Sequence, residues 1–248
     1  MTNRITKPLL SGLALFSLLA AGAAHADVVV TTGAGYIPMV KALSEAYAKE
    51  MGGKISTAFG GNIGQMLAQV KEGSGVNVVI SDRASLGKFT KLLAADETVL
   101  GTTPIVLVWK KGLELKTPTD LKEAAFARIA MPDPKAAVYG RSADDYLKTT
   151  GLDKDLGAKV NIVSTVPQVT AYVVKGEMDA GFVNRAAAKN AAGKLGGQLE
   201  IFDQHKPIVM TARPVVQVAQ KDAADVKAFL GWLTGATAKE ILKANGLD

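Results

Sequence analysis

The sequence predicts an α/β protein of two lobes, in which each lobe is a mainly parallel sheet flanked by helices and two crossing strands join the lobes. Strand, glycine-rich turn and helix follow one another twice between residues 28 and 73, an order typical of a parallel sheet covered by helices. Two long apolar strands, Pro104–Trp109 and Pro207–Ala219, enclose a middle section with the same alternation. An inserted second lobe explains this arrangement, and its two crossings predict a hinge with a cleft.

The first 26 residues have the features of a secretory signal. Arg4 and Lys7 precede an apolar segment, Leu9–Ala24, and Ala24–Ala26 is a small-residue cleavage site. The segment is shorter than the about 20 residues that cross a membrane. We expect cleavage after Ala26 and a periplasmic protein, because the chain has no cysteine for a lipid anchor. An uncleaved anchor would also place the remainder outside the cytoplasm.

The first lobe begins with a strand, Val28–Thr31, a turn, Gly33–Tyr36, and an amphipathic helix. Apolar residues recur in this helix at the i, i+3, i+4, i+7 spacing between Tyr36 and Tyr47, and Pro38 suits its first turn. The start of such a helix leaves backbone N–H groups unpaired at a positive dipole end. The turn therefore predicts an anion site.

The same analysis places the other elements. In the first lobe we expect strands at Lys54–Phe59 and Val76–Ile80 and helices at Ile63–Val70, Ala84–Leu93, Ala223–Leu233 and Ala236–Ala244. In the middle section we expect strands at Arg128–Met131, Val160–Val163 and Asp179–Val183 and helices at Tyr139–Thr149 and Pro167–Lys175. Together with the signal peptide over residues 1–26, these elements divide the chain into a discontinuous first lobe over 27–103 and 214–248 and a second lobe over 104–213.

Composition excludes several classes of function. The chain has no cysteine, and His205 is its single histidine beyond the leader, which leaves no thiolate, histidine cluster or metal-cation site. The net charge of +6 is spread without a basic run, so we expect no nucleic-acid partner. The acidic pairs Asp144-Asp145 and Asp153/Asp155 lack a neighbour that would raise a carboxyl pKa. We therefore expect neither an enzyme nor a resident cofactor.

A dinucleotide site at the first turn is also disfavoured. Pro38 stands where the fingerprint has its third glycine, and the second strand ends in Ala58-Phe59 instead of an acidic residue.

Comparable corners follow strands in the middle section. They are Met131–Gly140, Val163–Gln168 and Gly176–Asn184, and in open α/β sheets ligands bind beyond the carboxyl ends of the strands, where these loops lie. The order of the segments resembles the periplasmic molybdate-binding protein family of ABC importers, a type II solute-binding fold, over essentially the whole chain after the leader. The pieces that carry this resemblance are Phe59-Gly60-Gly61 before a helix, Val78–Asp82, the loop from Asp133-Pro134 to Tyr139-Gly140, and Gly176–Val183.

The resemblance implies an oxyanion held without counter-charges. Serine hydroxyls and backbone N–H groups of the first two loops would meet backbone N–H groups and a tyrosine of the second lobe. This chain has Gly35 where the first loop of the family offers a serine, Gly61 and Asn62 where the second carries serines, and Asn184 at the tyrosine position. Backbone donors survive these changes and hydroxyl donors do not. The ligand thus stays open between a molybdate- or tungstate-like oxyanion and another anion, of phosphate or small carboxylate type.

We expect an exported solute-binding protein, monomeric, that delivers its anion to an inner-membrane ABC permease; a sensor and, less favoured, an enzyme on the same fold are the alternatives. We expect no directly bound metal cation, and a metal would be present only within the molybdate oxyanion at the ligand site. Arg141 and Arg185 follow ligand loops directly, where they would either face solvent or add a charge to the cleft. The predicted ligand-binding residues are Ala34, Gly35, Tyr36, Gly61, Asn62, Ile63, Tyr139, Gly140, Arg141, Val166, Pro167, Gln168, Asn184 and Arg185.

Overall fold

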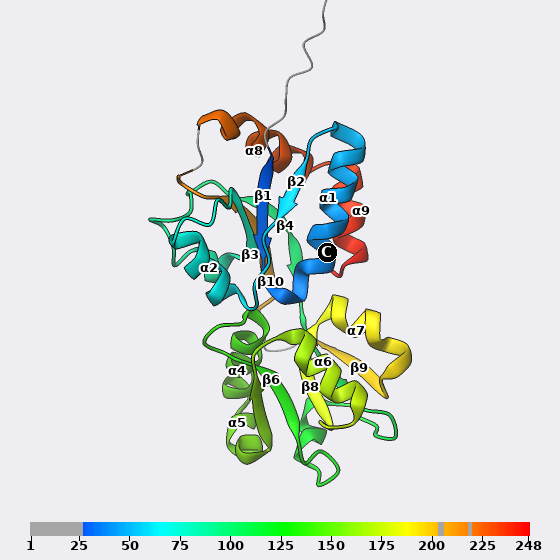
Figure 1. Cartoon of the computed structure of the whole chain (residues 1–248). Coiled ribbons are helices and arrows are strands. Elements are labelled where there is room, and N and C mark those ends of the chain that lie inside the picture. Colours follow the sequence, from blue (N-terminus) through cyan, green and yellow to red (C-terminus); the bar gives the residue numbers. More distant parts are fainter. Residues whose placement is uncertain (1–26, 203–205, 218–219) are drawn as a thin grey trace, which may run out of the picture.

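The computed structural model describes residues 27–202, 206–217 and 220–248. The predicted leader and His205 lie outside the described residues. The chain forms two lobes, each built on a five-stranded sheet, one above the other in Figure 1. No helix within the described part is long and apolar enough to cross a membrane.

The first sheet has the strand order β2-β1-β3-β10-β4. Its strands are β1 (Val28–Thr32), β2 (Ile55–Thr57), β3 (Val78–Asp82), β4 (Thr98–Thr103) and β10 (Ile208–Pro214). β1 pairs in parallel with β2 and β3, whereas β10 runs antiparallel to both β3 and β4. The sheet is therefore mixed, with its parallel part on one side.

The second sheet repeats this plan in the order β7-β6-β8-β5-β9. Its strands are β5 (Ile105–Trp109), β6 (Ile129–Pro132), β7 (Val160–Val163), β8 (Ala180–Asn184) and β9 (Gly197–Ile201). β6 is parallel to β7 and β8, and β5 is antiparallel to β8 and β9. In each sheet the fourth strand is the one that has just crossed from the other lobe.

The second crossing differs from the predicted boundary. Residues 207–213 are predicted in the second lobe, but β10 pairs with β3 from Met210 to Pro214 and with β4 from Ile208 to Ala212. By sheet membership, residues 208–214 thus belong to the first lobe. The reason is that an apolar run shows that a strand is buried without showing which sheet buries it.

Helices cover both sheets (Figure 1). They are α1 (Ile37–Met51), α2 (Ile63–Lys71), α3 (Arg83–Leu86), α4 (Val138–Thr150), α5 (Leu152–Leu156), α6 (Val166–Lys175), α7 (Arg185–Ala191), α8 (Gln220–Trp232) and α9 (Ala236–Ala244), with short 3-10 turns η1 (Ala34–Tyr36), η2 (Pro118–Lys122), η3 (Gly157–Lys159) and η4 (Ala192–Lys194). Glycines in the left-handed conformation end α1, α4 and α6.

The predicted helix at Ala84–Leu93 is wrong in length, because α3 ends at Leu86. Beyond Gly87 the chain turns, and Leu93 forms an isolated bridge with Val215. Leu86 and Leu93 are buried on either side of this turn, whereas Phe89 between them is exposed. The strands β4 and β9 and the helices α5 and α7 were not predicted.

The core of each lobe lies along its central strands. All residues of β3, β5 and β8 are buried. Phe229 packs edge-on against Tyr47 beneath α1, and Phe182 fills the centre of the second lobe. Burial of this apolar surface fixes the strands and with them the loops at their carboxyl ends.

Gly140 shows how closely a helix start approaches a strand end. A Cβ atom at this position would lie 2.1 Å from the carbonyl oxygen of Pro132. We expect Gly140→Ala to lower the free energy of unfolding by about 1–3 kcal/mol, because α4 must move away from β6.

The matched control is Gly231→Ala in α8, where an added Cβ meets nothing within 4 Å. There the same change is expected to be neutral or to stabilise by up to about 1 kcal/mol, since alanine favours a helix. Urea unfolding of both variants checks the pair, and equal midpoints would contradict the packing role of Gly140.

Candidate functional site

A small cavity of about 30 Å³ lies between the lobes, where the carboxyl ends of β1, β3 and β6 face one another. A single water molecule needs about 10–15 Å³ by the same kind of measure, so the cavity leaves little free space. None of the described residues at its wall is charged. The wall consists of Gly33, Ala34, Gly35, Tyr36, Asn62, Ile63, Ser81, Ala137, Val138, Tyr139, Thr165 and Val166.

Helix starts from both lobes meet at this wall. α2 begins at Ile63, α4 at Val138 and α6 at Val166, and the turn η1 leads into α1. The backbone N–H groups of Ile63, Val138, Tyr139 and Val166 donate to no acceptor in the part of the chain that the structure describes. These N–H groups carry partial positive charge, so the wall is electropositive without a cation.

Two other expected backbone donors are engaged inside the first lobe. The N–H group of Ala34 donates to the carbonyl oxygen of Gly61 at 2.9 Å, and Asn62 N–H donates to Gln65 Oε1 at 3.0 Å. Asn62 accepts from Gln65 N–H in return, which completes a capping box at the start of α2. Gly61 adopts a positive φ of 84° to bring its carbonyl oxygen to Ala34. These bonds fix the first two loops to each other.

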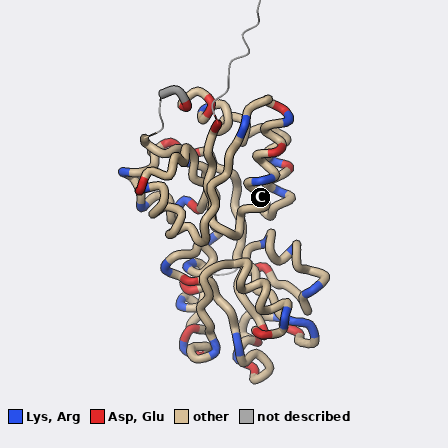
Figure 2. The backbone as a smooth tube through the Cα atoms, in the orientation of Figure 1, with Lys and Arg blue, Asp and Glu red and all other residues tan. Residues whose placement is uncertain are grey.

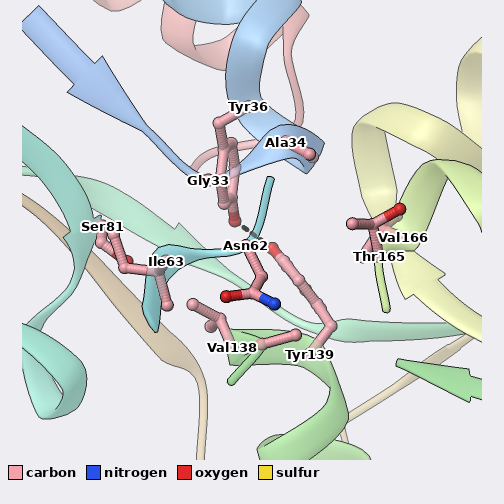
Figure 3. Close-up of a pocket in the computed structure, with 12 residues that line it drawn as sticks. Gly33, Ala34, Tyr36, Asn62, Ile63, Ser81, Val138, Tyr139, Thr165 and Val166 are labelled. Atoms are coloured by element: carbon pink, nitrogen blue, oxygen red, sulfur yellow. Dashed lines mark hydrogen bonds between the residues drawn. The ribbon is translucent and has the colours of Figure 1, made fainter. Parts of the chain in front are cut away.

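Tyr36 and Tyr139 approach from opposite lobes, and their hydroxyl groups form a hydrogen bond across the cavity (Figure 3). Both side chains are buried. Burial is the main cause that raises the pKa of each phenol well above its ordinary value, and the negative charge of Asp82 raises both further. In Tyr139 the bonds to Tyr36 and Thr103 offset part of that rise in pKa. Both phenols are therefore neutral hydrogen-bond donors at physiological pH.

Asn184 joins the lobes next to the cavity. Its Nδ2 donates to the carbonyl oxygen of Gly35 at 2.9 Å, while its Oδ1 accepts from Ala187 N–H at 2.8 Å and caps α7. A Cβ at position 35 would lie 3.0 Å from Asn184 Nδ2, so the glycine gives the asparagine room. Asn184 thus contacts the first ligand loop and does not line the cavity.

The two arginines pair with carboxylates outside the cavity wall. Arg141 Nη2 lies 3.2 Å from both carboxylate oxygens of Asp82 and donates to Ser85 Oγ at 2.5 Å. Arg185 donates to Glu200 Oε1 at 2.7 Å and to Asp248 Oδ2 at 2.6 Å. Each arginine belongs to the second lobe and each reaches a residue of the first lobe. Both therefore bridge the lobes.

The other predicted site residues surround the cavity without lining it. Gly140 packs α4 against β6, and Pro167 faces a neighbouring groove between α6 and α7. Gln168 Oε1 accepts from the N–H groups of Ser164 and Thr165 and closes a capping box at the start of α6. Of the predicted set, the cavity wall contains Ala34, Gly35, Tyr36, Asn62, Ile63, Tyr139 and Val166.

Sequence reasoning missed several wall residues, of which Ser81 and Thr165 bring hydroxyl groups. Ser81 is buried at the end of β3, and its Oγ lies 3.4 Å from Asp82 Oδ2. Thr165 Oγ1 accepts from Gln168 N–H at 3.4 Å. A threonine followed three residues later by glutamine signals a capping box. This pattern could have identified Thr165 as the residue that caps the start of α6. The remaining missed residues are Gly33, Ala137 and Val138.

Charge does not gather into one region of the surface. In Figure 2, basic and acidic segments alternate over both lobes. Among the described residues, no group of three histidine, cysteine, aspartate or glutamate side chains is placed to hold a metal ion. The unpaired N–H groups of Ile63, Val138, Tyr139 and Val166 are neutral donors at the wall, and helix starts of this kind suit a small anion.

The fold and the sequence match known proteins along almost their whole length. The chain is 30% identical over 251 residues to the molybdate-binding protein ModA of Rhodobacter capsulatus, covering 95% of this chain and 94% of that protein. The solved periplasmic molybdate-binding protein of Azotobacter vinelandii superposes with a TM-score of 0.79 and 27% identity, over 90% of this chain and 99% of that one.

A more distant structure, PEB3 with bound L-phospholactate, has a TM-score of 0.71 at 17% identity over 89% of this chain and 98% of that one, and shares the fold alone. Residues 28–248 match the model of a whole protein family, described as bacterial extracellular solute-binding protein. This match covers all but the predicted leader. The chain is a member of the bacterial extracellular solute-binding protein family.

Proposed function

We propose that this protein is the solute-binding subunit of an ABC importer and captures a small tetrahedral oxyanion, molybdate or tungstate, between its lobes. The observation that carries the proposal is the uncharged cavity at which unpaired N–H groups of three helix starts meet. The names of the R. capsulatus and A. vinelandii relatives support the same ligand. Delivery to an inner-membrane permease from the periplasm, as a monomer and without chemical turnover, belongs to this proposal.

Neutral donors are sufficient for tight capture. A hydrogen bond to a charged group contributes about 1.5–3 kcal/mol, so five or six of them contribute roughly 8–18 kcal/mol. Closure of the lobes and ordering of side chains subtract several kcal/mol. The remainder corresponds to micromolar to nanomolar dissociation constants.

A second candidate ligand is another small anion, of phosphate or carboxylate type. Gly35 and Asn184 favour it, because they remove hydroxyl donors that the resemblance implies for molybdate. The hydroxyl groups of Tyr36, Tyr139, Ser81 and Thr165 lie at the same wall and offer replacements. These phenol and hydroxyl groups stay neutral. Binding of molybdate or tungstate to them therefore requires no change of protonation in the protein.

Calorimetric titration separates the two ligands. Residues 27–248, unfolded and refolded to remove bound solute, are titrated with molybdate, sulfate, phosphate and acetate. We expect stoichiometric heat with molybdate and a dissociation constant at or below the micromolar range. Binding of phosphate or acetate alone would favour the second candidate, and no heat with any of the four would contradict the proposed function.

The bond from Asn184 to Gly35 predicts a loss of affinity without a loss of stability. In Asn184→Ser the hydroxyl keeps the cap of α7 but does not reach the Gly35 carbonyl. We expect molybdate binding about 2- to 10-fold weaker, since a net hydrogen bond is worth about 0.5–1.5 kcal/mol, and a melting temperature close to that of wild type. Asn184→Ala is the comparison variant, because it loses the cap as well and should also melt earlier. Unchanged affinity in both variants would show that the bond from Asn184 to Gly35 does not contribute to closure of the lobes around the anion.

The raised pKa values of Tyr36 and Tyr139 predict a specific loss of stability in alkali. The folded protein holds both phenolic protons above the pKa of about 10 that unfolded tyrosine has. The free energy of unfolding should therefore be unaffected by these groups below pH 10 and fall as the pH rises above it.

The variant Tyr36→Phe/Tyr139→Phe removes both groups and should show a shallower decline between pH 9.5 and 11. Urea unfolding of wild type and of the double variant at successive pH values measures the two slopes. Lysine titration is common to both proteins, so the difference between the slopes reports the two phenols. Identical slopes would show that the two phenols titrate normally in the folded protein.

A further inference from the structure

A buried carboxylate lies one residue from the cavity wall. Asp82 follows Ser81, which lines the cavity, and only 5% of the Asp82 side chain is exposed. Its charge acts on both cavity phenols, since it raises the pKa of Tyr36 and of Tyr139. A negative charge at this depth opposes an anion in the cavity, because interior charges are weakly screened.

The groups around Asp82 leave one cation in contact with it. Ser85 N–H donates to Asp82 Oδ1 at 2.9 Å, and Ser81 Oγ lies 3.4 Å from Oδ2. Arg83, the next residue, pairs with Glu97 at 2.6 Å instead. Among the ion pairs of the described residues, Asp82 is matched by Arg141.

The pair forms across the cleft. Asp82 ends β3 of the first lobe, and Arg141 lies near the start of α4 in the second lobe, two residues after the wall residue Tyr139. The arginine contacts both carboxylate oxygens and Ser85 Oγ. These contacts exist only while the two lobes are together.

We propose that Arg141 is a positioning residue which neutralises Asp82 when the lobes close, so that the closed cavity accepts an anion that Arg141 itself does not touch. The proposal rests on the proposed function, because it concerns binding at the same cavity. It assigns the affinity for the anion partly to a charge pair outside the wall. Burying Asp82 without its partner is unfavourable, so the pair also decides how readily the lobes close.

A double-mutant cycle that removes each charge of the pair tests the proposal. In protein made from the full chain, Arg141→Gln should bind molybdate about 10- to 100-fold more weakly than wild type, since it leaves a buried charge unpaired. Asp82→Asn keeps the cap of α3 and should bind within about threefold of wild type or more tightly. The double variant Arg141→Gln/Asp82→Asn should return to within about threefold of wild type.

The control is Arg128→Gln, which breaks an ion pair with Asp179 inside the second lobe and should leave affinity unchanged. If the contact were purely structural, the double variant would not recover affinity and would bind molybdate as weakly as Arg141→Gln. That result, or wild-type affinity in Arg141→Gln, would overturn the proposal.

A second measurement does not depend on the identity of the anion. The chain lacks cysteine, so spin labels at Lys49→Cys and Lys154→Cys, one exposed position in each lobe, report the distance between the lobes. Without anion, Arg141→Gln should shift the population towards longer distances, and the added Asp82→Asn should reverse the shift. Identical distance distributions in all three proteins would overturn the inference. Failure of wild type to bind molybdate, sulfate or phosphate would instead contradict the proposed function.

Discussion

The carboxyl ends of the parallel strands in both sheets face one cavity, and the remaining contacts of the structure keep them opposed. β2 leads to α2, β6 to α4 and β7 to α6, so each corner presents the start of a helix. Because the unpaired N–H groups at these helix starts belong to the backbone, their chemistry depends on turn geometry more than on side-chain identity. The helix starts therefore keep the cavity electropositive with glycine at position 35 and asparagine at position 184.

Formal charges are kept one layer away from the wall. Arg141 is matched with Asp82 and Arg185 with Glu200 and Asp248, and each set spans the cleft. Together with the bond from Asn184 to Gly35, these contacts hold the lobes closed around neutral donors. A neutral and buried wall has a low local dielectric, which strengthens each hydrogen bond to an anion.

The order of the elements was predictable because its signals are local. Glycine-bearing turns and apolar periodicity predicted the strand Val160–Val163 and the helix Ala236–Ala244 with the bounds that the structure has. The strands β4 and β9 were missed because, among the described strands, each pairs only with a crossing strand that is distant in the sequence, β4 with β10 and β9 with β5. Their residues are half-exposed and carry little periodic signal.

The site was less predictable, since its contacts join distant residues. The turn at Gly33–Tyr36 and the tyrosine at position 139 follow from helix-start patterns, and both reach the cavity. No local pattern shows that Arg141 meets a carboxylate 59 residues away or that Asn184 reaches a carbonyl group 149 residues away. Whether a polar side chain contacts ligand or partner depends on this tertiary pairing.

The first connection between the lobes has a mechanical consequence. β4 ends at Thr103 and β5 begins at Ile105, so Pro104 alone separates two hydrogen-bonded strands. Proline fixes its own φ and restricts the residue before it, which leaves few soft torsions at this crossing. This crossing is therefore a stiff joint with few backbone conformations to lose. Shutting the cleft consequently costs little conformational entropy at this crossing, and more of the contact free energy remains for discriminating between solutes.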